Sequence, residues 1–97
     1  MKCAIDQYAI DKVRALRIQL ELTQEQLAEA AHVSSGFIGD VEAGTRDTKY
    51  NLRHLNAFAR LFKCSPREFL PEQALPEDWF YFLIGIYKLG VNFMRHW

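Results

Sequence analysis

The chain has 97 residues, of which 49% are apolar, and its 12 Lys and Arg residues balance its 12 Asp and Glu residues. These values suit one small domain with one hydrophobic core, and they exclude a disordered tail, a collagen-like repeat and a disulfide-dense scaffold. Cys3 and Cys64 are too few for a disulfide framework or a cysteine metal site. The sequence also reaches a charge too early for a signal peptide, so we expect a cytoplasmic protein.

Charged residues are grouped along the chain rather than mixed. Residues 21–43 contain five acidic residues and no Lys or Arg, whereas residues 44–67 contain six basic residues and one acidic residue. Solvated helix faces would explain each group taken singly. A basic group is also the kind of segment that contacts a nucleic-acid backbone, so both interpretations stay open at this point.

The first predicted helix ends at residues 21–23. Ile10, Val13 and Leu20 recur before that point at helical spacing, together with Arg14 and Arg17. Such spacing predicts one helix with an apolar side.

Two short helices with a tight turn between them follow. Thr23 is the predicted N-cap of the first, because Gln26 lies three residues further on and completes a capping box. Residues 32–33 form the turn, and Ser34 is the N-cap of the second helix. Gly44 ends that helix, as a C-terminal glycine does.

A fourth helix and a short fifth helix complete the predicted domain. Asn51 caps the fourth, and Ser65 followed by Pro66 begins the fifth, which ends before Pro71. The sequence shows no strand-like alternation, so it predicts an all-α domain of five helices over residues 5–70, followed by a linker at 71–76. The fourth helix is expected to direct five side chains inward: Leu52, Leu55, Phe58, Ala59 and Phe62.

Residues 77–97 form an apolar segment that one small domain cannot cover on every side. A narrow polar stripe predicts a helix, with a strand over residues 79–84 as the alternative. Lys88 interrupts the segment, so we expect no membrane span. We expect a dimerisation segment, with packing on its own domain as the alternative. The expected contact residues are Trp79, Phe82, Leu83, Ile86, Leu89, Phe93 and Trp97.

Two short helices joined by a tight turn form a helix-turn-helix. The motif residues are Leu22-Thr23-Gln24-Glu25-Gln26-Leu27-Ala28, Val33-Ser34, Phe37-Ile38 and Val41-Glu42-Ala43-Gly44. In these segments, over about residues 10–70, the chain resembles the phage repressor/Cro-type (XRE-like) helix-turn-helix family. The resemblance implies a sequence-specific DNA-binding transcription regulator, a dimeric repressor whose partner is double-stranded DNA.

The resemblance also implies roles for single residues. Positions that face the edges of DNA bases match Ser35, Gly36 and Asp40. Residues expected at DNA phosphates are Gln24, Arg46, Lys49 and Arg53. In similar domains, a partly buried ion pair occupies the positions of Arg17 and Glu42.

This chain departs from the family pattern at four positions. Gly36 and Gly39 replace polar side chains in the second helix of the motif, and each costs that helix about 1 kcal/mol relative to alanine. Asp40 repels phosphate but could accept a hydrogen bond from a cytosine amine. His32 stands in the turn where the family usually has Gly, at a position that needs a positive φ.

Nothing in the sequence indicates an enzyme. The three histidines share no metal-ligand spacing with one another or with the cysteines, and no phosphate-binding glycine loop is present. We therefore expect no catalytic residue, no metal and no cofactor. Two alternatives to a DNA-binding regulator remain: a module of the same fold that binds protein, with the C-terminal segment as the partner surface, and an antitoxin that binds both DNA and a toxin.

Overall fold

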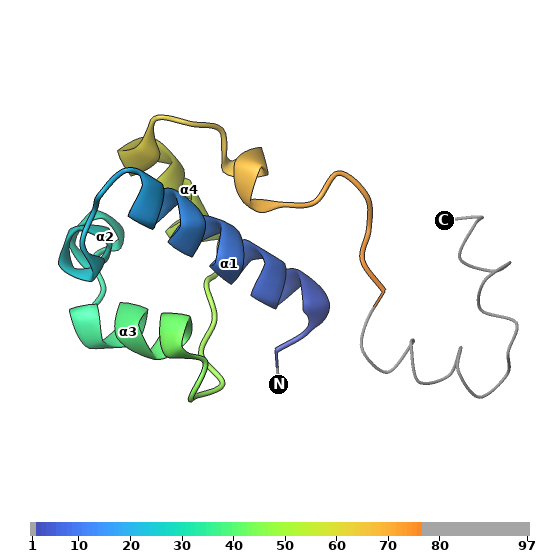
Figure 1. Cartoon of the computed structure of the whole chain (residues 1–97), viewed down its shortest axis with the longest axis horizontal. Helices are drawn as coiled ribbons and strands as arrows, with labels where there is room; N and C mark the ends of the chain where they lie inside the picture. Colours follow the sequence, from blue (N-terminus) through green and yellow to red (C-terminus); the bar gives the residue numbers. More distant parts are fainter. Residues whose placement is uncertain (1, 77–97) are drawn as a thin grey trace, which may run out of the picture.

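A computed structural model of the chain describes residues 2–76, and over this range all regular structure is helical. The predicted all-α fold is confirmed. Figure 1 shows α1 crossing the molecule with α2 and α3 at one end. The elements are α1 (Ala4–Gln19), α2 (Gln24–Ala31), α3 (Ser35–Ala43), α4 (Leu52–Phe62) and a short 3-10 helix, η1 (Pro66–Phe69).

Side-chain caps begin three of the helices where the sequence predicted them. The hydroxyl of Thr23 accepts a hydrogen bond from the Gln26 backbone N–H at 3.1 Å, and the Gln26 side chain accepts one from the Thr23 N–H. Ser34 caps α3 through the Phe37 N–H, and Asn51 caps α4 in the same way. Each cap satisfies backbone donors that the first turn of a helix leaves free.

Left-handed residues end all three of these helices, and Lys63, with φ of 58°, ends α4. Gly44 has φ of 71° at the end of α3, where a glycine costs nothing. His32 has φ of 56° at the end of α2, as the sequence predicted for the turn. This turn brings α3 directly back beside α2.

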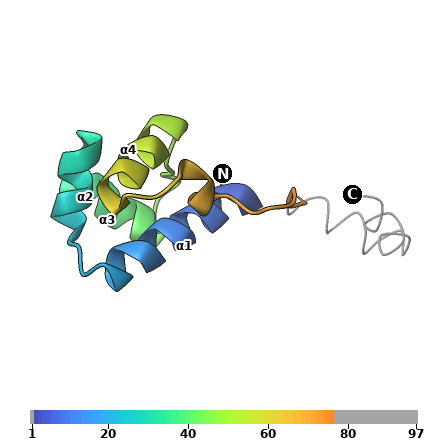
Figure 2. The same cartoon turned by 90° about the horizontal axis from the view of Figure 1, so that it is seen from above.

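The hydrophobic core lies where α1, α2, α3, α4 and η1 meet. Ile10 and Val13 of α1, Leu27 of α2, and Phe58 of α4 are almost completely buried. Phe69 of η1 is also fully buried and stacks edge-on against the Phe62 ring. Figure 2 shows, from above, η1 lying beside α1, so the chain after α4 returns to close the core.

Two predictions were wrong in detail. Leu52, expected to face inward, is 79% exposed, because it is the first residue of α4 and lies outside the face that packs on α2 and η1. The fifth helix is one 3-10 turn rather than an α-helix: Ser65 caps it and Pro71 follows closely, which leaves room for only four helical residues. The apolar segment 77–97, and all predictions on it, lie outside the described residues.

Candidate nucleic-acid interface

The first turns of α2 and α3 enclose an open hollow on one side of the molecule. Its lining includes four residues predicted to contact DNA, Gln24 at phosphate and Ser35, Gly36 and Asp40 at bases. Three further residues complete it: Thr23, Glu25 and Gly39. The sequence did not single these out as site residues, although each lies next to a predicted residue or one helical turn from it.

Backbone donors at the start of two helices give this hollow a partial positive charge. The first N–H groups of a helix lack intrahelical partners, and the helix dipole adds to their field. Thr23 and Ser34 cap only some of these donors. Helix ends of this kind favour anions, whereas the carboxylates of Glu25 and Asp40, in the same lining, oppose them.

The two glycines of α3 leave space in the hollow. A Cβ at position 39 would lie 3.4 Å from Oε1 of Gln24, at the limit of ordinary van der Waals contact. A Cβ at position 36 would meet only the Ser34 hydroxyl, at 3.9 Å. An alanine at position 39 would therefore touch the Gln24 side chain without a clash, and Gly36 presents bare backbone to the hollow.

The structure brings Arg17 and Glu42 together in a two-pronged ion pair. Arg17 Nε donates to Glu42 Oε2 at 2.7 Å, and Arg17 Nη2 donates to Oε1 at 2.8 Å. The third nitrogen of Arg17 donates to the carbonyl oxygen of Leu22 at 2.9 Å. One guanidinium thus joins α1, the loop before α2 and the end of α3.

Glu42 also reaches the hollow through Gln24. Its Oε1 accepts a hydrogen bond from Gln24 Nε2 at 3.1 Å, and only 5% of the Glu42 side chain is exposed. Burial alone would raise the pKa of Glu42, but the hydrogen bonds from Arg17 and Gln24 outweigh burial, and the pKa lies below its ordinary value. The Glu42 hydrogen bond therefore orients the Gln24 amide.

Asp40 and Arg46 form an exposed ion pair beside the hollow. Arg46 Nε lies 3.6 Å from Asp40 Oδ2, and the Arg46 side chain is 73% exposed and the Asp40 side chain 41% exposed. Such a pair contributes little to stability and rearranges easily. Arg46 lies in the loop after α3, so its guanidinium offsets the negative charge that Asp40 brings to this surface.

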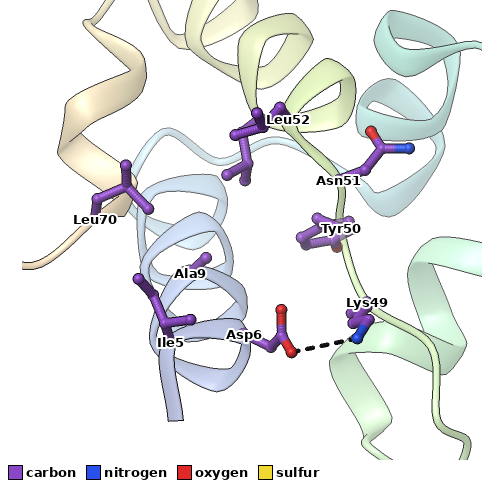
Figure 3. A pocket seen from close by; sticks show the side chains of 9 residues that line it. Ile5, Asp6, Ala9, Lys49, Tyr50, Asn51, Leu52 and Leu70 are labelled. Atoms are coloured by element: carbon purple, nitrogen blue, oxygen red, sulfur yellow. Dashed lines mark ion pairs between the residues drawn. The ribbon is translucent and has the colours of Figure 1, made fainter. Parts of the chain in front are cut away.

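Of the four predicted phosphate residues only Gln24 lines the hollow, and Arg46, Lys49 and Arg53 lie outside its lining. Lys49 Nζ lies 3.5 Å from Asp6 Oδ2 of α1 (Figure 3). Arg53 Nη1 donates to the carbonyl oxygen of Ala31, the last residue of α2, at 2.9 Å. These contacts hold α4 and the loop before it against α1 and α2.

A buried aromatic group behind α3 was not predicted from the sequence. His54 accepts a hydrogen bond from the Asn51 N–H through Nδ1 at 3.1 Å, and its ring packs against Phe37 and Tyr50. Burial lowers the pKa of His54, and the nearby charge of Arg53 lowers it further. Position 54 follows a predicted N-cap by three residues, which is the signal that could have shown this role.

Two further features concern the described part of the chain as a whole. Within residues 2–76, no group of three or more His, Cys, Asp or Glu side chains is placed to hold a metal ion. Over the same range, none of the helices is both long and apolar enough to cross a membrane.

Comparisons with known proteins agree with this geometry. The family model described as helix-turn-helix matches residues 13–69. A solved structure, the restriction-modification controller protein C.AhdI from Aeromonas hydrophila, superposes with a TM-score of 0.55 at 27% sequence identity. That alignment covers 68% of this chain and 96% of the controller protein. No curated protein sequence matches this chain.

Proposed function

The chain belongs to the helix-turn-helix family of DNA-binding transcription regulators, and we propose that it acts as a dimeric repressor without enzymatic activity. The observation that carries this proposal is the hollow between the first turns of α2 and α3, where Gln24, Ser35, Gly36 and Asp40 lie together. The similar solved structure is that of a restriction-modification controller protein. We propose that this chain has a regulatory role as well.

Phosphate contacts position the protein on DNA in this proposal. Gln24 binds a phosphate next to the free N–H groups of α2, with its amide held by Glu42. Arg46 contacts the phosphate backbone from the loop after α3, and it exchanges the Asp40 carboxylate for phosphate on binding. Lys49 and Arg53 reach phosphate only by giving up their present contacts with Asp6 and with the Ala31 carbonyl oxygen.

Base contacts supply the sequence preference. α3 enters the major groove with Ser35 and Gly36 at its leading end. Asp40 lies one turn further along α3 and accepts a hydrogen bond from a cytosine amine. Because Gly36 has no side chain, α3 approaches the bases closely at that position and reads few of them.

Dimerisation places two copies of α3 on two half-sites. Two-fold operators match two-fold proteins, because half-sites one helical turn apart face the same side of the duplex. The proposed dimer contact is the apolar segment 77–97, because its large apolar side chains are stabilised by burial against another surface.

A salt titration with duplex DNA tests the proposal. Each phosphate contact releases counterions, so DNA affinity falls steeply as salt rises. The expected result is a linear fall of log affinity with log salt, of a slope that matches several phosphate contacts. No measurable affinity for any duplex would contradict the proposal and would favour the alternative of a module that binds protein through its apolar C-terminal segment, a contact that depends little on salt.

A further inference from the structure

An apolar groove lies far along α1 from the proposed DNA-binding hollow. It is formed by the start of α1, the start of α4 and the end of η1, and Figure 3 shows Ile5, Leu52 and Leu70 around it. Its volume is about 440 Å³. Ala9, Tyr50 and Leu55 form its apolar floor.

Exposed apolar side chains gather at this groove. Among the described residues, five large hydrophobic side chains are exposed, and three of them line the groove: Ile5 at 37%, Leu70 at 40% and Leu52 at 79%. Single exposed leucines need no explanation, but three around one groove mark a surface that another apolar group covers.

The same chain supplies an apolar group next to the groove. Leu70, on the rim, is the residue that ends η1, so the chain leaves the folded domain at the groove itself. Residues 71–76 then connect it to the C-terminal segment, 77–97, in which 13 of 21 residues are apolar or aromatic. Six connecting residues span at most roughly 20 Å, which is enough for a return to the groove beside Leu70.

We propose that the C-terminal segment of the chain docks in its own apolar groove, with Leu52 and Leu70 as the main contacts. A short connection gives the segment a high effective concentration at its own groove, which favours this over the groove of another copy. One side of the segment is covered in this way, and its opposite side remains for the dimer. The proposal thus adds a docking site to the proposed assembly and does not depend on DNA binding.

Tryptophan fluorescence of the full chain tests this docking. Both tryptophans, Trp79 and Trp97, lie in the C-terminal segment, so emission reports on that segment alone. The test variant is Leu52→Asp, which places a carboxylate in the groove at the first residue of α4, where a negative charge suits the helix dipole. The matched control is Leu20→Asp, because Leu20 is 45% exposed and does not line the groove.

The expected result is a shift of the emission maximum to longer wavelength, with several-fold greater quenching by acrylamide, in Leu52→Asp but not in Leu20→Asp. Leu70→Asp should act like Leu52→Asp, and circular dichroism checks that each variant stays helical. Emission equal in Leu52→Asp, Leu20→Asp and the unaltered chain would overturn the proposal.

Dilution separates this docking from the proposed dimer. The comparison is therefore made at a dilution at which sedimentation shows that both the unaltered chain and Leu52→Asp are monomers. Tryptophans that remain better protected from acrylamide in the unaltered monomer than in the Leu52→Asp monomer support docking in the chain's own groove. Equal quenching of the two monomers would mean that the segment is covered only by the partner copy, and it would overturn the proposal. A monomer at every concentration with buried tryptophans would support the docking and contradict the dimer.

Discussion

Glu42 and Gln24 lie 18 positions apart, and their side chains meet through a hydrogen bond of 3.1 Å between Gln24 Nε2 and Glu42 Oε1. Glu42 is also the partner of Arg17 in the buried ion pair. Gln24, a proposed phosphate contact, is therefore hydrogen-bonded to the ion pair that joins α1 to α3. This relationship connects the stability of the fold with the orientation of the proposed DNA-binding surface.

Removing one member of the ion pair should destabilise the domain strongly. Arg17→Ala leaves the Glu42 carboxylate buried without its main partner, and we expect a loss of about 3–5 kcal/mol in the free energy of unfolding. Glu42→Ala should cost a similar amount, and the double variant far less than the sum. Urea unfolding measures all three. Arg46→Ala is the control, because its 73% exposed side chain should contribute less than about 0.5 kcal/mol. Small losses of stability in the two single variants that add up in the double variant would show that the ion pair does not stabilise the fold.

Gln24→Ala and Arg46→Ala should weaken binding to all duplexes alike, because phosphates carry no sequence information. For Gln24→Ala we expect a loss of about 1 kcal/mol, the contribution of one hydrogen bond, with the salt dependence unchanged. Arg46→Ala should lower the slope of log affinity against log salt by about one charge. Fluorescence anisotropy at several salt concentrations measures both. A loss confined to one duplex sequence would place either residue at a base instead.

Asp40→Ala should change which base is preferred at one position in each half-site, because Asp40 is the proposed acceptor for a cytosine amine. A correct contact of this kind discriminates by about 1–3 kcal/mol against the wrong base. Competition between duplexes that differ at single positions measures the preference. Equal strengthening on every duplex would show that Asp40 acts only as a repulsive charge that Arg46 offsets.

Stability should fall as the pH drops below about 6.5, and His54 should be a cause. The pKa of His54 is lowered in the folded chain by burial and by Arg53. As the pH falls, the unfolded chain therefore takes up a proton first, and this proton uptake stabilises the unfolded state relative to the folded one. The Glu42 pKa is also lowered, and its contribution is present above pH 4.5 and lost only below that value.

Urea unfolding at pH 7.5, 6.5 and 5.5 measures the His54 effect. His54→Gln keeps an acceptor for the Asn51 N–H at the third position of α4 but has no titrating group. The variant should lose less stability than the unaltered chain over this range. An identical pH dependence in both proteins would exclude His54 as a cause.

A chain that ends after Pro71 should stay folded but be monomeric. The helical core lies within residues 9–69, so its packing should be retained. The proposed dimer contact, residues 77–97, is removed. Sedimentation of the full and shortened chains measures the assembly, and DNA binding by the shortened chain should be weaker because the second half-site is lost. A shortened chain that still dimerises would place the contact in the domain itself.

Local rules predicted most of the fold. Thr23, Ser34, Asn51 and Gly44 are caps that act on neighbouring residues, so their types and spacing were sufficient. The prediction for Leu52 was wrong because helical spacing shows which residues share a face but not where that face ends. The α-helical prediction after Ser65 overlooked how few residues precede Pro71.

Contacts between distant residues were harder to predict. The sequence indicated Gln24 and Glu42 separately, but their hydrogen bond depends on how α2 and α3 pack across a left-handed His32. Arg53 belongs to a basic group, yet its bond to the Ala31 carbonyl oxygen depends on the position of α4 beside α2. Charge patterns therefore located a basic group in the sequence without showing which of its cations are already bound within the protein.

Selection of bound sites from random duplexes tests the central claim most directly. The full chain should enrich one sequence with two-fold symmetry, whose half-sites are about 10 base pairs apart or a multiple of that. Such a result requires base recognition by α3 and assembly into a dimer at the same time. Recovery of duplexes with no common sequence would contradict the account, because the surface of Gln24, Ser35, Gly36 and Asp40 would then not read DNA.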